Sequence, residues 1–148
     1  MKKVILNKCY GMFQVSPRGY SLYAKKIGKQ INCYRGSHDS ENGLVYVKES
    51  LDDFIKGMPT LFYFYSTMNY GDEVTCSTCK NSFEGCLILD EEHRFDPILI
   101  EVVEELGDDA NGIGSELKVV EIPDDVAEDY VIDNYDGFER LHKKVIEY

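Results

Sequence analysis

The residue types best suited to bind a ligand lie in a loop between a short apolar stretch, residues 4–6, and a helix expected to begin at Ser16 and Pro17. Such a loop presents free backbone N–H groups and the positive end of the helix dipole, which together suit an anion. Basic side chains would add charge, and aromatic ones could stack on a base. An ordinary connection into a capped helix is the alternative. The candidate ligand-binding residues are Lys8, Tyr10, Gly11, Phe13 and Arg18, together with Arg94 and Asp96.

Four residues have types that bind zinc. Cys76 and Cys79 form a C-x-x-C pair, in which two thiolates can hold one metal ion. Cys86 and His93 follow downstream and could complete a set of four ligands. Because the later spacings match no standard zinc pattern, a redox-active pair and loop cysteines without a metal stay open as alternatives. No other cofactor is predicted.

Carboxylates are the remaining candidates for chemistry. Glu91, Glu92 and Asp96 lie near His93 and Arg94, before a predicted helix. Acid–base catalysis needs two carboxyl groups in unlike environments within one cleft. Nothing in the spacing indicates such a pair, so a solvated face is the simpler interpretation. The motifs Gly-x-Ser-x-Gly and His-Glu-x-x-His are absent from the sequence. No catalytic residue is therefore predicted, and the sequence leans against an enzyme.

The charge of the chain is strongly acidic and unevenly distributed. The 148 residues carry a net charge of −11. Residues 1–60 hold ten Lys/Arg against five Asp/Glu, a net of +5, and residues 61–148 hold six against twenty-two, a net of −16. A large acidic surface repels free nucleic acid and favours basic partners. A role in solubility alone is the alternative.

No part of the sequence predicts export or membrane insertion. Lys2 and Lys3 precede an apolar stretch far shorter than a signal-peptide core. No run approaches the roughly 20 apolar residues of a membrane helix. Five cysteines, an odd number, without a secretory signal indicate a reducing compartment. We therefore expect a cytoplasmic protein with no membrane partner.

Hydrophobic patterning predicts strands and helices in mixed order. The predicted strands are residues 4–6, 30–34, 44–48, 60–66 (aromatic on both faces and so expected at the centre of a sheet), 86–89, 117–122 and 130–133. The predicted helices begin at Ser16, Ser50, Asp96 and Asp136, the last one extending to residue 147 with Phe138, Leu141 and Val145 inward. Residues 69–85 are predicted to be an irregular insertion that contains the cysteine pair.

These elements predict an α+β fold in a single globular domain over residues 1–148. Several predicted strands are neighbours joined by hairpins, which favours a mixed, mostly antiparallel sheet of about five or six strands with helices packed against it. A regular doubly wound α/β fold is the alternative, because helices and strands also alternate along parts of the chain.

Two blocks of the sequence resemble a known group of proteins. The first is KKVILNKCYG at residues 2–11, and the second comprises DPILIEVVEELG at 96–107, LKVVEIPDDV at 117–126 and YDG at 135–137. On these residues the chain resembles a family of short uncharacterised proteins of bacteriophages and prophages. Similar members usually carry a second glycine where this chain has Met12, and the insertion with Cys76 and Cys79 departs from the family. The resemblance implies a viral or mobile-element setting and no particular reaction.

Two classes of function fit these observations. The first is a phage accessory protein that acts by binding in the host cytoplasm and counteracts a host process such as antiviral defence. It would block a basic host protein with its acidic face, or sequester a nucleotide signal in the loop at residues 8–18, within a homo-oligomer. The second is a small enzyme acting on a nucleotide or another phosphorylated small molecule. In that enzyme Lys8, Arg18 and Arg94 would hold phosphate. Glu92 or Asp96 would transfer a proton.

Overall fold

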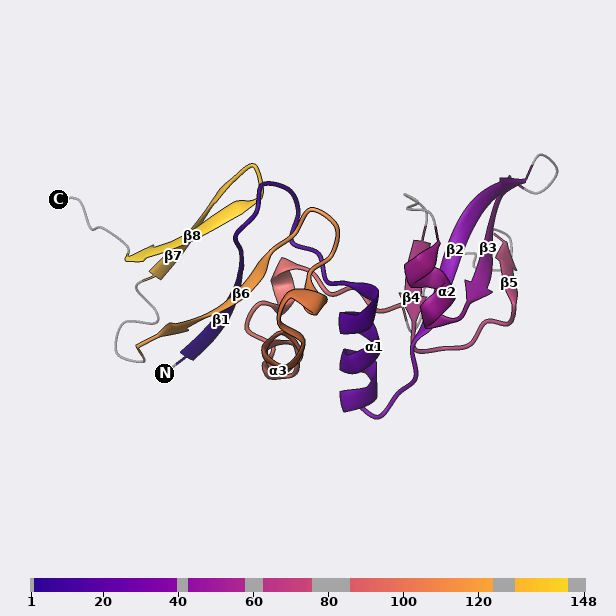
Figure 1. Ribbon diagram of the computed structural model, residues 1–148, viewed down its shortest axis with the longest axis horizontal. Helices are drawn as coiled ribbons and strands as arrows, with labels where there is room; N and C mark the ends of the chain where they lie inside the picture. The colour runs from indigo at the N-terminus through magenta and orange to yellow at the C-terminus, as the bar shows by residue number, and fades with distance from the viewer. Residues whose placement is uncertain (1, 40–42, 58–62, 76–85, 124–129, 144–148) are drawn as a thin grey trace. The chain divides into compact units, whose positions relative to one another are not determined.

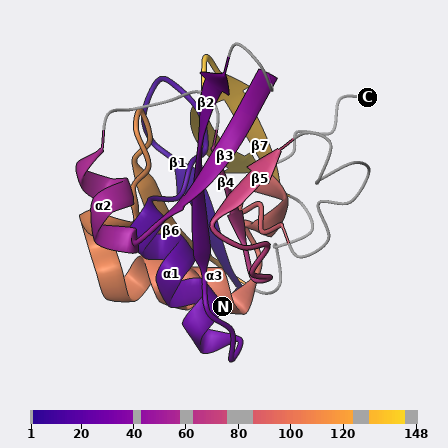
Figure 2. The same ribbon diagram turned by 90° about the vertical axis from the view of Figure 1, so that its right-hand side faces the viewer.

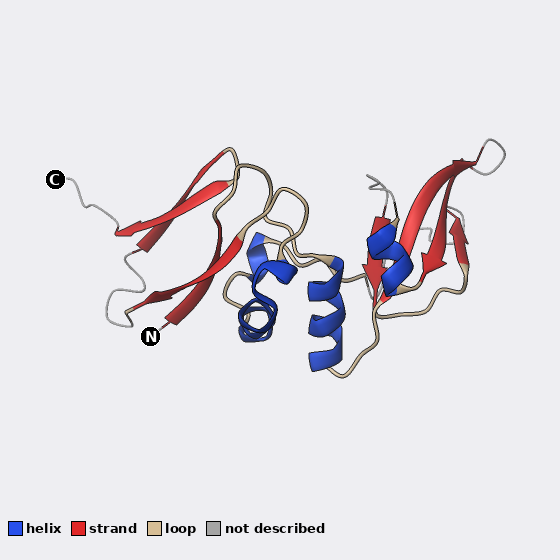
Figure 3. Cartoon of the chain, in the orientation of Figure 1, coloured by secondary structure: helices blue, strands red, loops and turns tan. Residues whose placement is uncertain are grey.

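The computed structural model describes residues 2–39, 43–57, 63–75, 86–123 and 130–143 of the chain. Its helices and strands, drawn in Figures 1 and 3, are β1 Lys2–Asn7, α1 Pro17–Lys26, β2 Asn32–Asp39, β3 Gly43–Glu49, α2 Leu51–Lys56, β4 Tyr63–Ser66, β5 Glu73–Thr75, η1 Glu91–His93, α3 Pro97–Leu106, η2 Gly107–Ala110, β6 Leu117–Ile122, β7 Tyr130–Tyr135 and β8 Phe138–Lys143. The named strands pair antiparallel, which confirms the predicted α+β class. Among the described helices, none is both long and apolar enough to cross a membrane.

The chain divides into two compact units. Unit 1 comprises Met1–Gly19 and Leu89–Tyr148, and unit 2 comprises Tyr20–Ile88. In the described residues the strands form three sheets, where we expected one sheet of about five or six strands. Unit 1 holds the pairs β1-β6 and β7-β8, and unit 2 holds a sheet of order β4-β2-β3-β5. The single domain over residues 1–148 stays a prediction.

One half of unit 1 consists of the first strand, its partner β6 and helix α3. Strand β1 pairs with β6 over its whole length, from Lys2↔Ile122 to Asn7↔Leu117. Helix α3 contacts both strands (Figure 1) and buries an apolar face. It begins where predicted, because the Asp96 side chain accepts the N–H of Ile98 at 2.9 Å and so satisfies a free donor of the first turn. The predicted strand at 117–122 is likewise confirmed.

The other half of unit 1 is a hairpin, and here the predicted helix from Asp136 is wrong. Strands β7 and β8 are joined by a tight turn in which Asp136 has φ 50° and Gly137 has φ 94°. Two successive positive φ angles define the turn that fits the twist of a two-residue hairpin. The Asn134 side-chain oxygen stabilises the turn by accepting the N–H of Gly137 at 2.9 Å. Residues 138–143 are consequently extended.

The core of unit 1 binds its two strand pairs together. Val4 and Leu6 of β1 and Ile122 of β6 are buried, with at most 2% of their surface exposed. Partly buried apolar residues from both pairs cover them, namely Val120, Tyr130, Ile132 and Leu141. Leu141 was expected inward on a helix and reaches this core from a strand instead. Val145, expected beside it, lies outside the described residues.

Unit 2 is built on the hairpin of β2 and β3, which Figure 2 shows as neighbouring strands. Among the described residues β4 lies at one end of the strand order, with a single bridge from Ser66 to Cys86 beyond it, so the described part of residues 60–66 is not at the centre of the sheet as predicted. The buried Tyr65 ring stacks on Tyr20 of α1, with 3.9 Å between ring centroids. On the other face of the sheet the Phe64 ring stacks on Tyr34 of β2, with 4.7 Å between ring centroids. The aromatic residues of β4 are therefore explained by packing on both faces of the sheet and do not indicate a central strand. Strand β5 falls inside the segment predicted to be irregular, and residues 86–89 contribute an isolated bridge at Cys86.

Candidate binding site

Three loops of unit 1 meet backbone to backbone at one point, the three-loop junction. They are the loop after β1 around Gly11, the loop before β6 around Gly114, and the turn at Asp136 and Gly137. The Gly11 N–H donates to the Asp136 carbonyl at 2.8 Å. A Cβ atom on Gly137 would overlap the Gly11 carbonyl, and one on Gly11 would overlap the Gly114 carbonyl. The close approach of three backbones therefore requires glycine at these positions.

Side chains at the end of β1 fix this junction. Asn7 is fully buried and donates from Nδ2 to the Gly137 carbonyl at 2.9 Å, while its Oδ1 accepts the N–H of Glu116 at 2.9 Å. Lys8 donates from Nζ to the main-chain carbonyl of Glu139 at 2.8 Å. These bonds satisfy polar groups that would otherwise be buried unpaired. They also hold the first loop against the β7–β8 hairpin.

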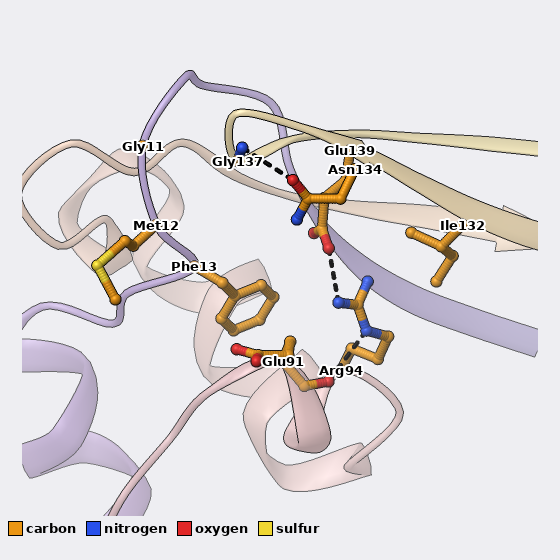
Figure 4. A pocket seen from close by; sticks show the side chains of 9 residues that line it. All are labelled: Gly11, Met12, Phe13, Glu91, Arg94, Ile132, Asn134, Gly137 and Glu139. Carbon is orange, nitrogen blue, oxygen red and sulfur yellow. Dashed lines mark hydrogen bonds and ion pairs between the residues drawn. The ribbon is translucent and has the colours of Figure 1, made fainter.

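A buried ion pair lies directly below the junction. Glu139 of β8 accepts the main-chain N–H of Asn7 on Oε1 at 2.8 Å and the Nη2 of Arg94 on Oε2 at 2.6 Å (Figure 4). The two side chains are only 3% and 12% exposed. Arg94 also donates from Nε to the Glu91 carbonyl at 3.0 Å, and its guanidinium lies 5.6 Å from the centre of the Phe13 ring. Its Nη1 is buried and has no hydrogen-bond partner in the part of the chain that the structure describes. Because both side chains are buried and paired with each other, the contact has a structural role, and we call the Arg94–Glu139 ion pair the clasp.

A pocket of about 480 Å³ opens beside the clasp. That volume suits a small ligand or an inserted side chain. Its lining residues come from the first loop, from η1 and the residue after it, and from the β7–β8 hairpin: Gly11, Met12, Phe13, Glu91, Arg94, Ile132, Asn134, Gly137 and Glu139. In Figure 4 the Glu91 carboxylate lies on the Phe13 side of the pocket, while the Arg94 guanidinium lies toward Glu139. The pocket belongs wholly to unit 1.

The pocket presents negative charge. The positive charge of Arg94 is compensated by Glu139 at 2.6 Å. Glu91 is exposed, and its carboxylate has no hydrogen-bond or ion-pair partner among the residues the structure describes. An unpaired carboxylate beside a compensated cation leaves the wall with a net negative charge. A cationic group is therefore favoured over a phosphate.

The structure brings together three of the seven predicted ligand-binding residues. Gly11, Phe13 and Arg94 line the pocket. Lys8 and Tyr10 lie next to it: the Lys8 Nζ is 5.4 Å and the Tyr10 ring 5.3 Å from the Phe138 ring. The two others are not part of its lining. Arg18 is exposed in the first turn of α1, and Asp96 caps α3.

The predicted zinc ligands do not form a cluster in the described residues. No group of three or more His, Cys, Asp or Glu side chains there has the geometry to hold a metal ion. His93 lies 3.5 Å from Asp90 through Nδ1, and Cys86 is half-buried in unit 2. Cys76 and Cys79 lie outside the described residues. The zinc site stays a prediction.

A nucleophilic role for the buried thiol of unit 2 is disfavoured. Burial, together with the nearby Glu49 carboxylate, raises the pKa of Cys33 to about 11. Burial also raises the pKa of Tyr65. A thiol reacts as its thiolate, and a raised pKa keeps this one protonated near neutral pH. Cys33 therefore acts as a small apolar core residue.

Glu139 and Asn134 are the polar side chains of the pocket that the sequence patterns missed. Glu139 lies in the segment that was predicted to form the final helix, and Asn134 lies two residues before that segment. The available signal was the dipeptide Asp136-Gly137, which is typical of a two-residue hairpin turn. Such a turn would place Glu139 at the second position of a strand, next to the apolar Phe138, where a carboxylate that points inward needs an ion-pair partner. The spacing of Phe138 and Leu141 favoured the helix instead.

Fold and site define an α+β protein with an acidic pocket at a three-loop junction. No protein-family model matches the chain, and searches of curated proteins and of solved structures find no match either. Charge, contacts and burial are therefore the basis on which we assign a function.

Proposed function

We propose that this protein acts by binding, and that its partner is a basic protein that meets unit 1. The observation that carries the proposal is the location of the charge. Unit 1 holds nine Lys/Arg against nineteen Asp/Glu, a net of −10, whereas unit 2 holds seven against eight, a net of −1. A charge of this size steers an oppositely charged protein toward the unit that carries it.

The basic residues of the first half do not oppose this field, because four of the ten lie within the acidic unit and six lie in unit 2. Lys3 pairs with Glu104 of α3 at 3.0 Å. Lys8 is held by the Glu139 carbonyl, and Arg94 by the Glu139 carboxylate. The contrast between residues 1–60 and 61–148 along the sequence is thus not a contrast between the two units. The cations of unit 1 named here are occupied by internal contacts, while acidic side chains such as Glu91 and Glu92 stay exposed.

The resemblance to bacteriophage and prophage proteins adds a setting to the proposal. In that setting the basic partner is a host protein in the cytoplasm, and binding would block the surface with which it meets nucleic acid. Counteracting antiviral defence is the process that fits best.

The nucleotide alternative is less well supported by the geometry. It requires Lys8, Arg18 and Arg94 to direct free positive charge at one phosphate. Of these, Arg94 alone lines the pocket, and Glu139 compensates it. An enzyme acting on phosphorylated molecules has the same difficulty, and Asp96 is occupied as a helix cap. Thermal stabilisation by a mono-, di- or cyclic nucleotide would reverse this ranking.

The test is a pull-down from host lysate at about 50 mM and about 500 mM salt, followed by titration of each identified partner. Two matched triple variants each remove three exposed negative charges, one variant from unit 1 and the other from unit 2. One is Glu92→Gln, Asp109→Asn and Glu121→Gln in unit 1, and the other is Asp52→Asn, Asp72→Asn and Glu73→Gln in unit 2. We expect a basic partner that is lost at high salt and that binds the unit 1 variant about tenfold more weakly.

Two results would count against the proposal. Equal weakening by the two triple variants would mean that the charge of unit 1 has no special part. Absence of any salt-sensitive basic partner would remove the proposal altogether, and a co-purifying nucleotide seen by native mass spectrometry would replace it.

A further inference from the structure

We infer that the pocket of unit 1 receives an arginine side chain of the basic partner, with Glu91 as the residue that recognises it. The inference rests on the proposed function and adds to it the anchoring side chain and the pocket that holds it. Three features carry it: an unpaired carboxylate, an aromatic wall and a rim of exposed apolar side chains.

The first feature is the Glu91 carboxylate. It lines the pocket on the Phe13 side and has no partner among the described residues (Figure 4). Its main-chain carbonyl is held by Arg94, which fixes the backbone from which this side chain projects. A carboxylate presented from a fixed backbone can accept two parallel N–H bonds from a guanidinium. The pocket thus offers a preformed partner for arginine.

The second feature is that the pocket tolerates a further cation. The internal guanidinium of Arg94 would repel an incoming one if its charge were free, but Glu139 compensates it at 2.6 Å. The Phe13 ring, which Arg94 contacts at 5.6 Å, provides an aromatic wall of the kind on which guanidinium groups stack. Because arginine is less strongly hydrated than lysine and is planar, it fits such a wall better.

The third feature is the rim at the three-loop junction. Four large apolar side chains next to the junction glycines are strongly exposed: Tyr10 at 65%, Met12 at 66%, Ile113 at 79% and Tyr135 at 72%. In the described part of unit 1, the one other large apolar side chain that is exposed is Phe95, at 44%. Exposed apolar side chains gathered in one place indicate a protein contact. A rim that excludes water strengthens an ion pair at its centre.

The experiment is an NMR titration of the isotopically labelled full chain with the peptide acetyl-Gly-Arg-Gly-amide. The comparison peptide carries citrulline, which has the same shape without the charge. We expect the arginine peptide to shift the amide signals of Gly11, Gly137 and Asn134, and the citrulline peptide to shift them far less. The matched variants are Glu91→Gln and Glu92→Gln. Each removes one negative charge from an exposed residue. Glu91 lines the pocket and Glu92 does not, so the second variant is the control.

The expected result is binding about tenfold weaker in Glu91→Gln and almost unchanged in Glu92→Gln. Amide spectra of both variants, alike outside the pocket, show that they fold. Equal weakening by both variants would overturn the inference, because a diffuse field would then explain the binding. Absence of shifts with the arginine peptide would overturn it too. In both cases a salt-sensitive basic partner from the pull-down would leave the proposed function standing.

Discussion

Glu139 connects three parts of unit 1 through its side chain and its main chain. One carboxylate oxygen completes the hydrogen bonding of Asn7 at the end of β1, and the other pairs with Arg94. Its main-chain carbonyl holds Lys8. A single side chain thereby connects the first strand, the residue after η1 and the last hairpin, which together form the walls of the pocket.

We predict that Glu139→Gln lowers the free energy of unfolding by about 3 to 5 kcal/mol, because it leaves the Arg94 charge buried without a counter-ion. The comparison is Glu49→Gln, which breaks the ion pair with Arg35 in unit 2, where the side chains are 25% and 19% exposed. That change should cost about 1 kcal/mol or less. Urea denaturation measures both. Similar losses for the two variants would show that the clasp is no stronger than a surface pair.

Cys33 gives a pH dependence of stability. Its pKa of about 11 in the folded protein lies above its ordinary value of 9.0, so folding favours the protonated thiol. Its contribution is complete below pH 9 and is lost as the pH rises to about 11. We predict that Cys33→Ala removes about 1 kcal/mol of the stability that is lost between pH 8 and pH 10, because pH 10 lies about one unit above the ordinary pKa of the thiol. Urea midpoints at pH 8 and pH 10 measure it, with Cys9→Ala as the control. An equally steep alkaline loss in both variants would refute the assignment.

Part of the site could be predicted from residue types alone. Gly11, Phe13 and Arg94 follow from the rule that a strand-to-helix loop gathers polar and aromatic groups. The opposite wall could not be found in this way, because it depends on pairing between segments about 130 residues apart, such as Asn7 with Gly137. Nor does the sequence indicate that Glu139 compensates Arg94, and this compensation changes the preferred ligand from anion to cation.

At the scale of elements, the turn between β7 and β8 decides the shape of the junction. We predict that Gly137→Ala costs about 3 kcal/mol or more, since it adds a clash with the Gly11 carbonyl to the strain of φ 94°. Gly28→Ala is the matched control, with φ 77° and open space around the new Cβ. It should cost about 1 to 2 kcal/mol. Thermal denaturation compares them, and equal costs would mean that the junction relaxes.

Helix starts could be predicted well because capping is local. Ser16, Ser50 and Asp96 each accept an N–H from their own first turn, as their positions before apolar periodicity indicated. Strand 117–122 was equally clear. The partner of each strand was not, since the pairing of β1 with β6 leaves no local trace. The last hairpin was missed because Phe138 and Leu141 are three residues apart, a spacing that fits one face of a helix, whereas in a strand it places the two side chains on opposite faces.

At the scale of the whole molecule, the charge of unit 1 should act against its own stability. Nineteen acidic residues in one unit repel one another, and added salt screens the repulsion. We predict that raising the salt from about 20 mM to about 200 mM slows hydrogen exchange in β1 and β6 by about threefold. Strands β2 and β3, in the nearly neutral unit 2, are the control within the same sample. Equal slowing in both units would show a general salt effect.

Unit 2 is inserted into unit 1, and this order has a consequence for synthesis. The ribosome releases β1 first, but its partner β6 begins at Leu117 and its clasp residue is Glu139. Unit 2 can fold while the first 19 residues still lack their partner strand, because its own strands pair between residues that are close in sequence. An apolar strand that contains Val4, Ile5 and Leu6 is therefore without its partner until most of the chain has emerged. During that interval the nascent chain is open to chaperones, to proteases and to the same strand of another copy.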